Sequence, residues 1–324
     1  MPLWRMLLTA TAIEVSFFAA LLAWLGLIGG PFNGWLDVIN NFAPVIFVVG
    51  CAAGASYRGL AGPLKKRLVL LLAALACFAT GLRMLPEALS SLPRPKAEGA
   101  PLRVLSFNVW EDNFDTRKTA DIILRTDADV VTLIENERLL KFEGDRIKAR
   151  YPYYAQCTPQ WVCGITIFSK QPIVSMGTLM PPLPLTGKGI SIVWATISAP
   201  NSVPVTVMTT HLAWPFPPKQ QALQRSLVAK TAARVKPDIL TGDMNLTPWS
   251  YALGDFDRRL DPLRRRTHAA FSWPANIARA NKPFPLPLLP IDQVYAAPEW
   301  RLQSVRRLPR AGSDHYGLVV TLVR

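Results

Sequence analysis

Three long stretches near the amino terminus carry almost no charge, and they restrict the fold more than any other feature of the chain. The stretch from Met6 to Ile28 contains one charged residue, Glu14. Val38–Tyr57 contains none, and neither does Leu68–Leu82, which lies between two arginines. A helix that crosses a bilayer needs about 20 mainly apolar residues. The third stretch is short, but its flanking arginines can reach the interface, so we expect three transmembrane helices within residues 1–86.

A cleaved signal peptide is the alternative interpretation of the first stretch. Such a peptide has a short apolar region followed by a cleavage site of small residues. Here Glu14 interrupts the apolar region, no clear cleavage site follows, and two further apolar stretches come next. These features favour a membrane anchor.

The loops between the apolar stretches differ in charge, which predicts their orientation. Residues 29–37 contain no lysine or arginine, whereas the loop between the second and third stretches contains four, Arg58, Lys65, Lys66 and Arg67. Positively charged loops stay on the cytoplasmic side. We therefore expect everything after about residue 93 to lie outside, which in a bacterium is the periplasmic face of the inner membrane.

The four cysteines also indicate on which side of the membrane the later part of the chain lies. Cys51 and Cys77 fall inside apolar stretches, and only Cys157 and Cys163 lie in the remainder of the chain. A disulfide that closes the short loop between these two would suit an oxidising compartment. Two free buried thiols are the alternative, and the sequence leaves both open.

The rest of the chain has the composition of a basic soluble domain. Residues 87–101 are rich in Pro, Ser and Ala and are predicted to form a linker to a second domain, 102–324. From Pro101 onward there are 28 lysines and arginines against 18 aspartates and glutamates. This excess favours an anionic partner such as nucleic acid, an anionic lipid headgroup or a phosphorylated small molecule, without distinguishing among them.

Alternating and β-prone runs predict a domain of mixed α and β structure. Two of them, 102–109 and 129–134, enclose a helix for which Asp115 or Thr116 is the expected cap. Strands without intervening helices are expected next, and their consecutive order indicates antiparallel pairing: 162–169, 173–179, 190–197 and 203–211. A helix over 217–235 follows. Such a chain favours two packed sheets with helices outside.

Polar residues stand at the ends of these strands. The set consists of Asn108, Glu135, His211, Asp243, Asn245, Asp292, Asp314 and His315. It includes two of the three histidines; the third, His268, is assigned no role. Asp243 and Asn245 are two residues apart, so in extended chain they project to one face. A carboxylate can hold a water and an amide can stabilise an oxyanion, although Asp and Asn after a Gly more often form a simple turn.

The motifs that contain these residues resemble those of the endonuclease/exonuclease/phosphatase superfamily, the DNase I-like fold. In order they are Ser-Phe-Asn-Val-Trp, Asp-Val-Val-Thr-Leu-Ile-Glu, Thr-His-Leu, Gly-Asp-Met-Asn, Ile-Asp-Gln-Val and Ser-Asp-His. The resemblance extends from about Leu102 to Val323. One departure is Ile134, at a position where the family often has Gln before the acidic residue.

The resemblance implies a four-layer α/β/β/α sandwich that hydrolyses phosphate esters with Mg²⁺ or Mn²⁺. Carried over by position, it implies that Glu135 binds the metal with Asn108 and Asp314 close by, and that Asp292 orients His315. It also implies that Asp243 and Asn245 position water and phosphate and that His211 contacts a phosphate oxygen. We therefore expect a membrane-anchored phosphodiesterase acting on nucleic acid or a phospholipid headgroup, with no obligate protein partner. A catalytically inactive phosphate- or lipid-binding module on the same fold is the alternative.

Overall fold

A computed structural model describes residues 2–92, 97–158, 163–180, 190–198, 203–277 and 282–324. The chain divides into two compact units. The first consists of Met1–Leu92 together with two short pieces of the later sequence, Phe216–Lys219 and Leu246–Gly254. The second consists of Pro93–Pro215, Gln220–Asn245 and Asp255–Arg324.

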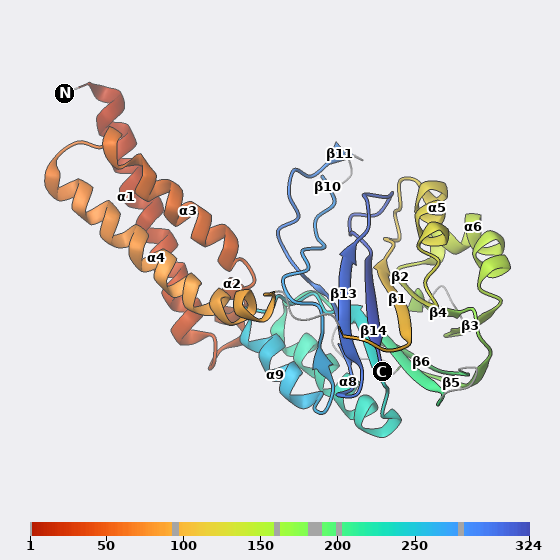
Figure 1. Cartoon of the computed structure of the whole chain (residues 1–324). Coiled ribbons are helices and arrows are strands. Elements are labelled where there is room, and N and C mark those ends of the chain that lie inside the picture. The colour runs from red at the N-terminus through yellow and green to blue at the C-terminus, as the bar shows by residue number, and fades with distance from the viewer. Residues whose placement is uncertain (1, 93–96, 159–162, 181–189, 199–202, 278–281) are drawn as a thin grey trace. The chain divides into compact units, whose positions relative to one another are not determined.

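Helices make up the first unit. In chain order they are α1 (Leu3–Trp24), which continues as the π-helical turn η1 (Leu25–Gly29), α2 (Gly34–Asn40), α3 (Ala43–Ala55), the 3₁₀ turn η2 (Ser56–Gly59) and α4 (Pro63–Ser90). Helices α1, α3 and α4 pack side by side (Figure 1). Small residues such as Ala20, Ala76 and Ala79 lie at their interface. Large apolar side chains such as Phe18 and Phe78 remain exposed on the outside, which is typical of helices that pack in lipid.

Among the described residues, two helices are long and apolar enough to cross a membrane, α1 with η1 and α4. The expected second span is broken instead: α2 and the helix from Ala43 to Gly59 meet at a bend of 58°. The candidate spans in this part of the chain therefore number two, or three if the bent pair counts as one. Asn40 and Asn41 stand at the bend with their side chains buried, and Pro44 lies in the first turn of α3.

The linker expected over 87–101 begins later than its composition suggests. Helix α4 continues to Ser90, so the first four residues of the expected linker are helical. Residues 93–96 of the linker lie outside the described part of the chain, as does Val162 at the start of the strand expected over 162–169.

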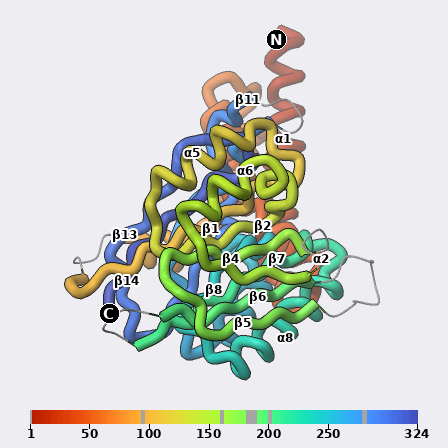
Figure 2. The backbone as a smooth tube through the Cα atoms, turned by 90° about the vertical axis from the view of Figure 1, so that its right-hand side faces the viewer, coloured from red at the N-terminus to blue at the C-terminus, as the bar shows by residue number. Residues whose placement is uncertain are grey.

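Two six-stranded sheets form the centre of the second unit (Figures 1 and 2). The first has the order β13-β14-β1-β2-β4-β3 and the second β5-β6-β7-β8-β12-β9. The strands of the first sheet are β1 (Pro101–Asn108), β2 (Val130–Ile134), β3 (Tyr153–Gln156), β4 (Ile165–Ser169), β13 (Arg301–Arg307) and β14 (Leu318–Val323). Those of the second are β5 (Ile173–Leu179), β6 (Ser191–Ile197), β7 (Val205–His211), β8 (Ile239–Asp243), β9 (Arg264–Arg265) and β12 (Asp292–Ala296). A separate pair is formed by β10 (Asn276–Ile277) and β11 (Lys282–Pro283).

Helices cover the outer faces of the sheets. Helices α5 (Thr116–Thr126) and α6 (Glu137–Arg150) lie on the side of β1, β2 and β4, and α8 (Pro218–Val235) lies on the side of β5 and β6 (Figure 2). The remaining labelled helix is α9 (Tyr251–Arg259). The expected cap of α5 is present, since Asp115 Oδ1 accepts the backbone N–H of Lys118 at 2.9 Å. The arrangement of helices, two sheets and helices confirms the predicted fold class.

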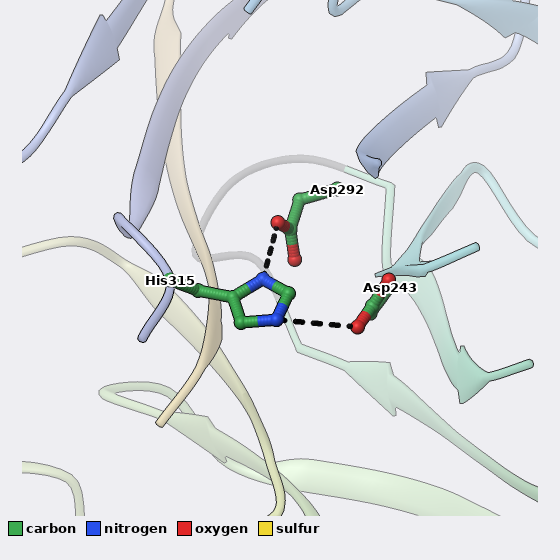
Figure 3. Close-up of side chains that lie close together, drawn as sticks. All are labelled: Asp243, Asp292 and His315. Carbon is green, nitrogen blue, oxygen red and sulfur yellow. Dashed lines mark hydrogen bonds and ion pairs between the residues drawn. The ribbon is translucent and has the colours of Figure 1, made fainter. Parts of the chain in front are cut away.

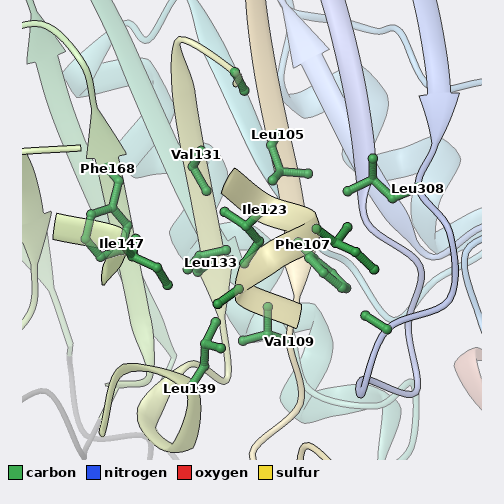
Figure 4. Packing of buried hydrophobic residues seen from close by; sticks show 14 of the residues in the cluster. Leu105, Phe107, Val109, Ile123, Val131, Leu133, Leu139, Ile147, Phe168 and Leu308 are labelled. Atoms are coloured by element: carbon green, nitrogen blue, oxygen red, sulfur yellow. The ribbon is translucent and has the colours of Figure 1, made fainter. Parts of the chain in front are cut away.

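A hydrophobic core fills the space between the first sheet and its helices (Figure 4). Alternate residues of the strands point into it, among them Leu105, Phe107, Val131 and Leu133, and Ile123 of α5 meets them. Every position of β2 is buried, because its other face is covered by the second sheet. Between the sheets, the hydroxyl of Thr241 donates to that of Thr132 at 2.9 Å.

Two details of the second unit extend the sequence-based expectations. Cys157 and Cys163 form a disulfide, which decides between the two alternatives left open for them. Strand β13 was not expected from its sequence, which contains three arginines at an edge of the sheet. Charged residues on an edge strand discourage pairing with other chains, and they also remove the apolar alternation by which a strand is recognised.

Candidate active site

The topology brings the polar strand ends to one edge. Strands β7 and β8 are parallel and pair His211 with Asp243, so both end at the same level. Strand β12 is antiparallel to β8 and pairs Asp292 with Asp243, so its beginning lies at that level too. In the other sheet, β14 is antiparallel to β1. The start of β14, shortly after His315, therefore lies near the end of β1 at Asn108. Strand β2 is parallel to β1 and ends just before Glu135, so residues from six strands meet in one place.

A histidine between two carboxylates lies at the centre of this place (Figure 3). His315 Nδ1 lies 2.8 Å from Asp292 Oδ2, and its Nε2 lies 3.6 Å from Asp243 Oδ2. All three side chains are buried. Because Nδ1 is engaged by Asp292, Nε2 is the nitrogen that faces the rest of the site.

Asn108 and Glu135 form the second part of the site. The Asn108 amide Nδ2 donates to Glu135 Oε1 at 2.9 Å and to Asp243 Oδ2 at 3.1 Å. Its oxygen accepts the backbone N–H of Trp110 at 3.0 Å, which fixes the orientation of the amide. The other oxygen of Glu135 accepts the N–H of Glu111 at 3.2 Å. Glu135 is therefore held from two sides while it stays partly exposed.

His211 and Asn245 form the third part of the site. His211 Nε2 lies 3.6 Å from both Glu135 Oε1 and Asp243 Oδ2, and 3.3 Å from Asn245 Nδ2. Asn245 Nδ2 also donates to the carbonyl of Leu212 at 2.8 Å. The backbone N–H of Asn245 donates to Asp243 Oδ1 at 2.9 Å, so the turn after β8 orients its own carboxylate.

Asp314 stands beside His315 with one oxygen satisfied and one not. Its Oδ2 accepts the indole N–H of Trp273 at 3.1 Å. Its Oδ1 lies 3.9 Å from His315 Nε2 and is buried with no hydrogen-bond donor among the described residues. A buried carboxylate oxygen without a donor is unfavourable, so this atom is suited to a positively charged ligand.

Three residues of the site have left-handed backbones, Trp110 (φ 61°), Glu135 (φ 53°) and Asn245 (φ 49°). This conformation is rare for residues other than glycine and costs about 1 kcal/mol or more. Asn tolerates it best, whereas Glu and Trp gain nothing from it locally. Such conformations concentrate at functional sites, where the surrounding structure maintains them.

The site contains more carboxylates than imidazoles, and their pKa values reflect this. Burial raises the pKa of Asp243 to about 6, and it also raises the pKa of Asp314. Burial alone would lower the pKa of His315, but Asp292, Asp314 and Asp243 outweigh burial and raise this pKa well above its usual range. For Glu135 burial is opposed by His211, Asn108 and His315, and its pKa is lowered. The carboxylates thus favour added positive charge.

The structure brings together all eight residues expected from the sequence, and it adds others. Within the described part of the chain, one group of three side chains has ligand atoms close enough for a shared metal ion: Asp243, Asp292 and His315. This group differs from the expected ligands Glu135, Asn108 and Asp314. The oxygen of Asn108 accepts the Trp110 N–H with one lone pair, which leaves its second lone pair for a cation.

Two residues that build the site, Ser313 and Trp273, are not recognisable as site residues from the sequence. The hydroxyl of Ser313 donates to the carbonyl of Asn108 at 2.7 Å and accepts the N–H of His315 at 2.9 Å, so it ties these two motifs together. Trp273 lies in a stretch that has no periodic pattern. Its position before Pro274 is the sole signal in the sequence, and that signal does not point to Asp314.

The fold is similar to that of several solved structures. TDP2 of D. rerio, solved with a single-strand DNA product, aligns with a TM-score of 0.53 at 18% identity and covers 69% of this chain and 99% of its own. The human Nocturnin catalytic domain with bound sulfate gives 0.51 at 16% identity, with 68% and 94% covered. TDP2 of Caenorhabditis elegans gives 0.52 at 14% identity, with 90% and 94% covered. No curated protein matches the sequence.

These similarities are too low in identity to establish more than the fold. A family model provides the stronger result, since it matches residues 105–315 and thereby includes every strand-end residue of the site. On this match, and with the two-sheet fold and the clustered motifs, the chain belongs to the Endonuclease/Exonuclease/phosphatase family.

Proposed function

We propose that the protein is a membrane-anchored phosphodiesterase that depends on a divalent cation and acts on the outer face of the membrane. The observation that carries the proposal is the row of side chains in which His315 contacts Asp292 with one ring nitrogen and faces Asp243 with the other. Glu135 and Asp314 lie beside this row. Family membership supports hydrolysis of a phosphate ester. The diester, the cation and the membrane are the additional elements of the proposal.

The residues fit a hard cation such as Mg²⁺ or Mn²⁺. Such cations prefer carboxylate oxygens and retain several waters. Glu135 offers a partly exposed carboxylate, and Asp314 offers an oxygen that lacks a donor among the described residues. These two residues would hold the ion, with Asn108 orienting Glu135. When bound, the ion supplies charge neutralisation of the phosphate.

His315 is placed to exchange a proton with the substrate. Its Nδ1 is engaged by Asp292, which fixes the ring, and its Nε2 faces Asp243 across 3.6 Å. A water or phosphate oxygen near Nε2 would contact both side chains. Because the ring keeps its proton among carboxylates, it can donate to an anionic oxygen, and after donating it can act as a base.

His211 and Asn245 present donors to the same region. Their polar groups lie 3.3 Å apart and both adjoin Asp243. An imidazole and an amide at this spacing are suited to two oxygens of one phosphate group. In-line attack on phosphorus depends mainly on such positioning and on charge stabilisation.

The surroundings of the site favour a diester with a large group attached to the phosphate. Trp273, which donates to Asp314, packs edge to face against Trp214 with ring centroids 6.0 Å apart. The Trp214 side chain is 51% exposed and so offers an aromatic surface next to the site. Both a nucleobase and an apolar lipid group can pack against such a surface. The excess of basic residues suits the phosphate of a nucleic acid and that of a phospholipid equally.

The charges of the first unit support the proposed orientation. Arg5 Nε donates to the carbonyl of Gly59 at 3.2 Å, so the amino-terminal arginine lies at the same end of the helices as the basic loop that contains Arg58 and Lys65. The opposite end, residues 29–42, has no lysine or arginine. With the basic end inside, α4 delivers the following chain to the outside. The disulfide between Cys157 and Cys163 suits that compartment.

The test uses the full chain in detergent, stripped with EDTA and supplied with Mg²⁺, Mn²⁺ or Ca²⁺. Plasmid DNA, single-stranded oligonucleotide, sphingomyelin vesicles and bis(p-nitrophenyl) phosphate are offered in parallel. We expect metal-dependent hydrolysis that falls on the order of 10²-fold or more in Glu135→Ala and in His315→Ala. His268→Ala is the matched control and should retain normal turnover.

The parallel substrates distinguish a nucleic-acid diester from a phospholipid diester. Cleavage of nucleic acid should weaken steeply with salt, because phosphate contacts release counterions. Cleavage of phospholipid should depend on presentation in vesicles. Normal turnover in Glu135→Ala or His315→Ala would refute the assigned site, and phosphate or lipid binding without turnover on any substrate would favour the inactive module.

A further inference from the structure

The first unit contains a buried polar network whose partners lie in a short segment from the later sequence. This segment, Thr247–Ala252, begins two residues after Asn245. Asn41 Oδ1 accepts both the backbone N–H of Thr247 at 2.9 Å and its hydroxyl at 3.1 Å. The carbonyl of Asn41 accepts the indole N–H of Trp249 at 3.1 Å. One residue at the bend between α2 and α3 therefore holds two positions of the segment.

Asp37 holds the end of the same segment. Its Oδ1 accepts the N–H of Tyr251 and its Oδ2 accepts the N–H of Ala252, each at 2.8 Å. Tyr251 and Ala252 lie in the first turn of α9, where N–H groups of a helix need acceptors from elsewhere. Asn40 Nδ2 donates to Asp37 Oδ1 at 2.9 Å and completes the set. A carboxylate from a distant helix thus serves as the cap of α9.

Arg83 supplies the third contact. Its Nε and Nη2 donate to the carbonyl of Trp249 at 2.9 and 2.6 Å, and its guanidinium lies 3.7 Å from the centre of the Tyr251 ring. The hydroxyl of Tyr251 in turn donates to the carbonyl of Leu27 at 2.8 Å. The segment is therefore contacted by α4 and by η1 as well as by α2.

Anchoring alone does not explain these side chains. A membrane anchor needs apolar surface, whereas Asp37, Asn40 and Asn41 are each 4% exposed and would be unfavourable without partners. The N–H groups of the later sequence that donate hydrogen bonds to Asp37 and Asn41 lie in this one segment. That segment is joined directly to the turn that carries Asp243 and Asn245. Asn245 has a left-handed backbone, which the chain on both sides must maintain.

We infer that Asp37, Asn41 and Arg83 are positioning residues for the catalytic turn. They fix the chain from Thr247 to Ala252, which follows Asn245 after one residue, and so restrain the carboxyl-terminal end of the turn that carries Asp243 and Asn245. The inference rests on the proposed function, because it assigns these two residues a part in turnover. It makes the anchor a component of the active enzyme rather than a tether.

The test compares full-length variants in detergent. Asn41→Leu removes the acceptor with little change in volume, and Asp37→Asn keeps the shape while it removes the charge. Asn33→Ala is the matched control, since the side chain of Asn33 instead accepts the N–H of Trp35 at 2.9 Å and so caps α2. Amide hydrogen exchange of peptides covering 243–254 and steady-state kinetics on the preferred diester are measured on each.

We expect exchange in 247–252 to accelerate at least about tenfold in Asn41→Leu and Asp37→Asn, with peptides of β1 and β2 unchanged. We expect kcat to fall about 10- to 100-fold while KM changes less than about twofold, since a small misplacement of reacting groups has effects of this size. The control should match the parent in both.

Unchanged exchange in 247–252, or faster exchange with an unchanged kcat, would overturn the inference. If Asn41→Leu fails to fold, Asp37→Asn and Arg83→Lys decide the matter by the same two measurements. Failure of the proposed function is distinguishable, because it would appear as a parent protein without turnover while the exchange of the segment still responds to Asn41→Leu.

Discussion

Replacing Asp243 by Asn should stabilise the metal-free protein while it removes activity. The carboxylate of Asp243 is only 2% exposed, and burial raises its pKa from 3.8 to about 6. A pKa difference of roughly two corresponds to about 3 kcal/mol of unfavourable free energy once the group is ionised. The substituted amide would still accept the N–H of Asn245, but it would face the Asn108 amide and lose that hydrogen bond, at about 1 kcal/mol. The difference between the gain of about 3 and the loss of about 1 is a net stabilisation of about 2 kcal/mol.

The sign of the effect depends on pH. Because the folded pKa of Asp243 is raised, its unfavourable contribution is absent below about pH 4, grows between pH 4 and 6, and is complete above pH 6. The variant should therefore be more stable than the parent at pH 7.5. Near pH 4 the gain disappears and the lost hydrogen bond remains. A difference of about 2 kcal/mol moves the melting temperature by roughly 4–8 °C.

The assay is thermal unfolding of the full chain in detergent with EDTA, at about pH 4 and pH 7.5, followed by the same measurement with Mg²⁺. Asp238→Asn is the control. Its carboxylate accepts the N–H of Thr206 at 2.8 Å away from the site, so its replacement should give no gain. An Asp243→Asn protein that melts at or below the parent temperature at pH 7.5 in EDTA would refute the reasoning.

Three further outcomes are expected. Asp292→Asn should lower kcat by about 10²-fold or more and move the His315 limb of the pH–rate profile to lower pH, because the ring loses its charged partner; an unmoved limb would count against the pair. Glu135→Gln should abolish both Mg²⁺-dependent turnover and the rise in melting temperature on adding Mg²⁺, measured in the same preparation. Thr132→Val should cost about 1–3 kcal/mol in denaturant unfolding by leaving the Thr241 hydroxyl unpaired, and the double change to valine should recover most of that loss.

The fold and the site differ in how far the sequence predicts them. Strands with alternating apolar residues and a carboxylate or imidazole at the end were recognisable, because both periodicity and strand-end chemistry are local properties. Glu135 and His315 could thus be assigned to one cluster from the sequence alone. Their mutual distances follow from strand register, which the sequence does not specify to one residue.

Other elements could not be predicted because distant contacts determine them. The apolar run Val38–Tyr57 is uniformly free of charge, yet the chain bends after Asn40, where polar side chains find partners more than 200 residues away. Strand β13 has an unfavourable local composition and exists because β14 offers it a partner. Trp273 reaches Asp314 from a segment without periodicity. In each case tertiary contacts override local preference.

The burial of Trp249 has a practical consequence for anyone who wishes to work with a soluble version of this enzyme. Its indole is 2% exposed, and Leu253 nearby is fully covered. A shortened polypeptide starting at residue 102 would leave the Trp249 indole without its acceptor on Asn41, and it would strip acceptors from the N–H groups of Thr247 and Tyr251. We expect such a product to aggregate or to turn over slowly, so rates measured on it would understate those of the full chain.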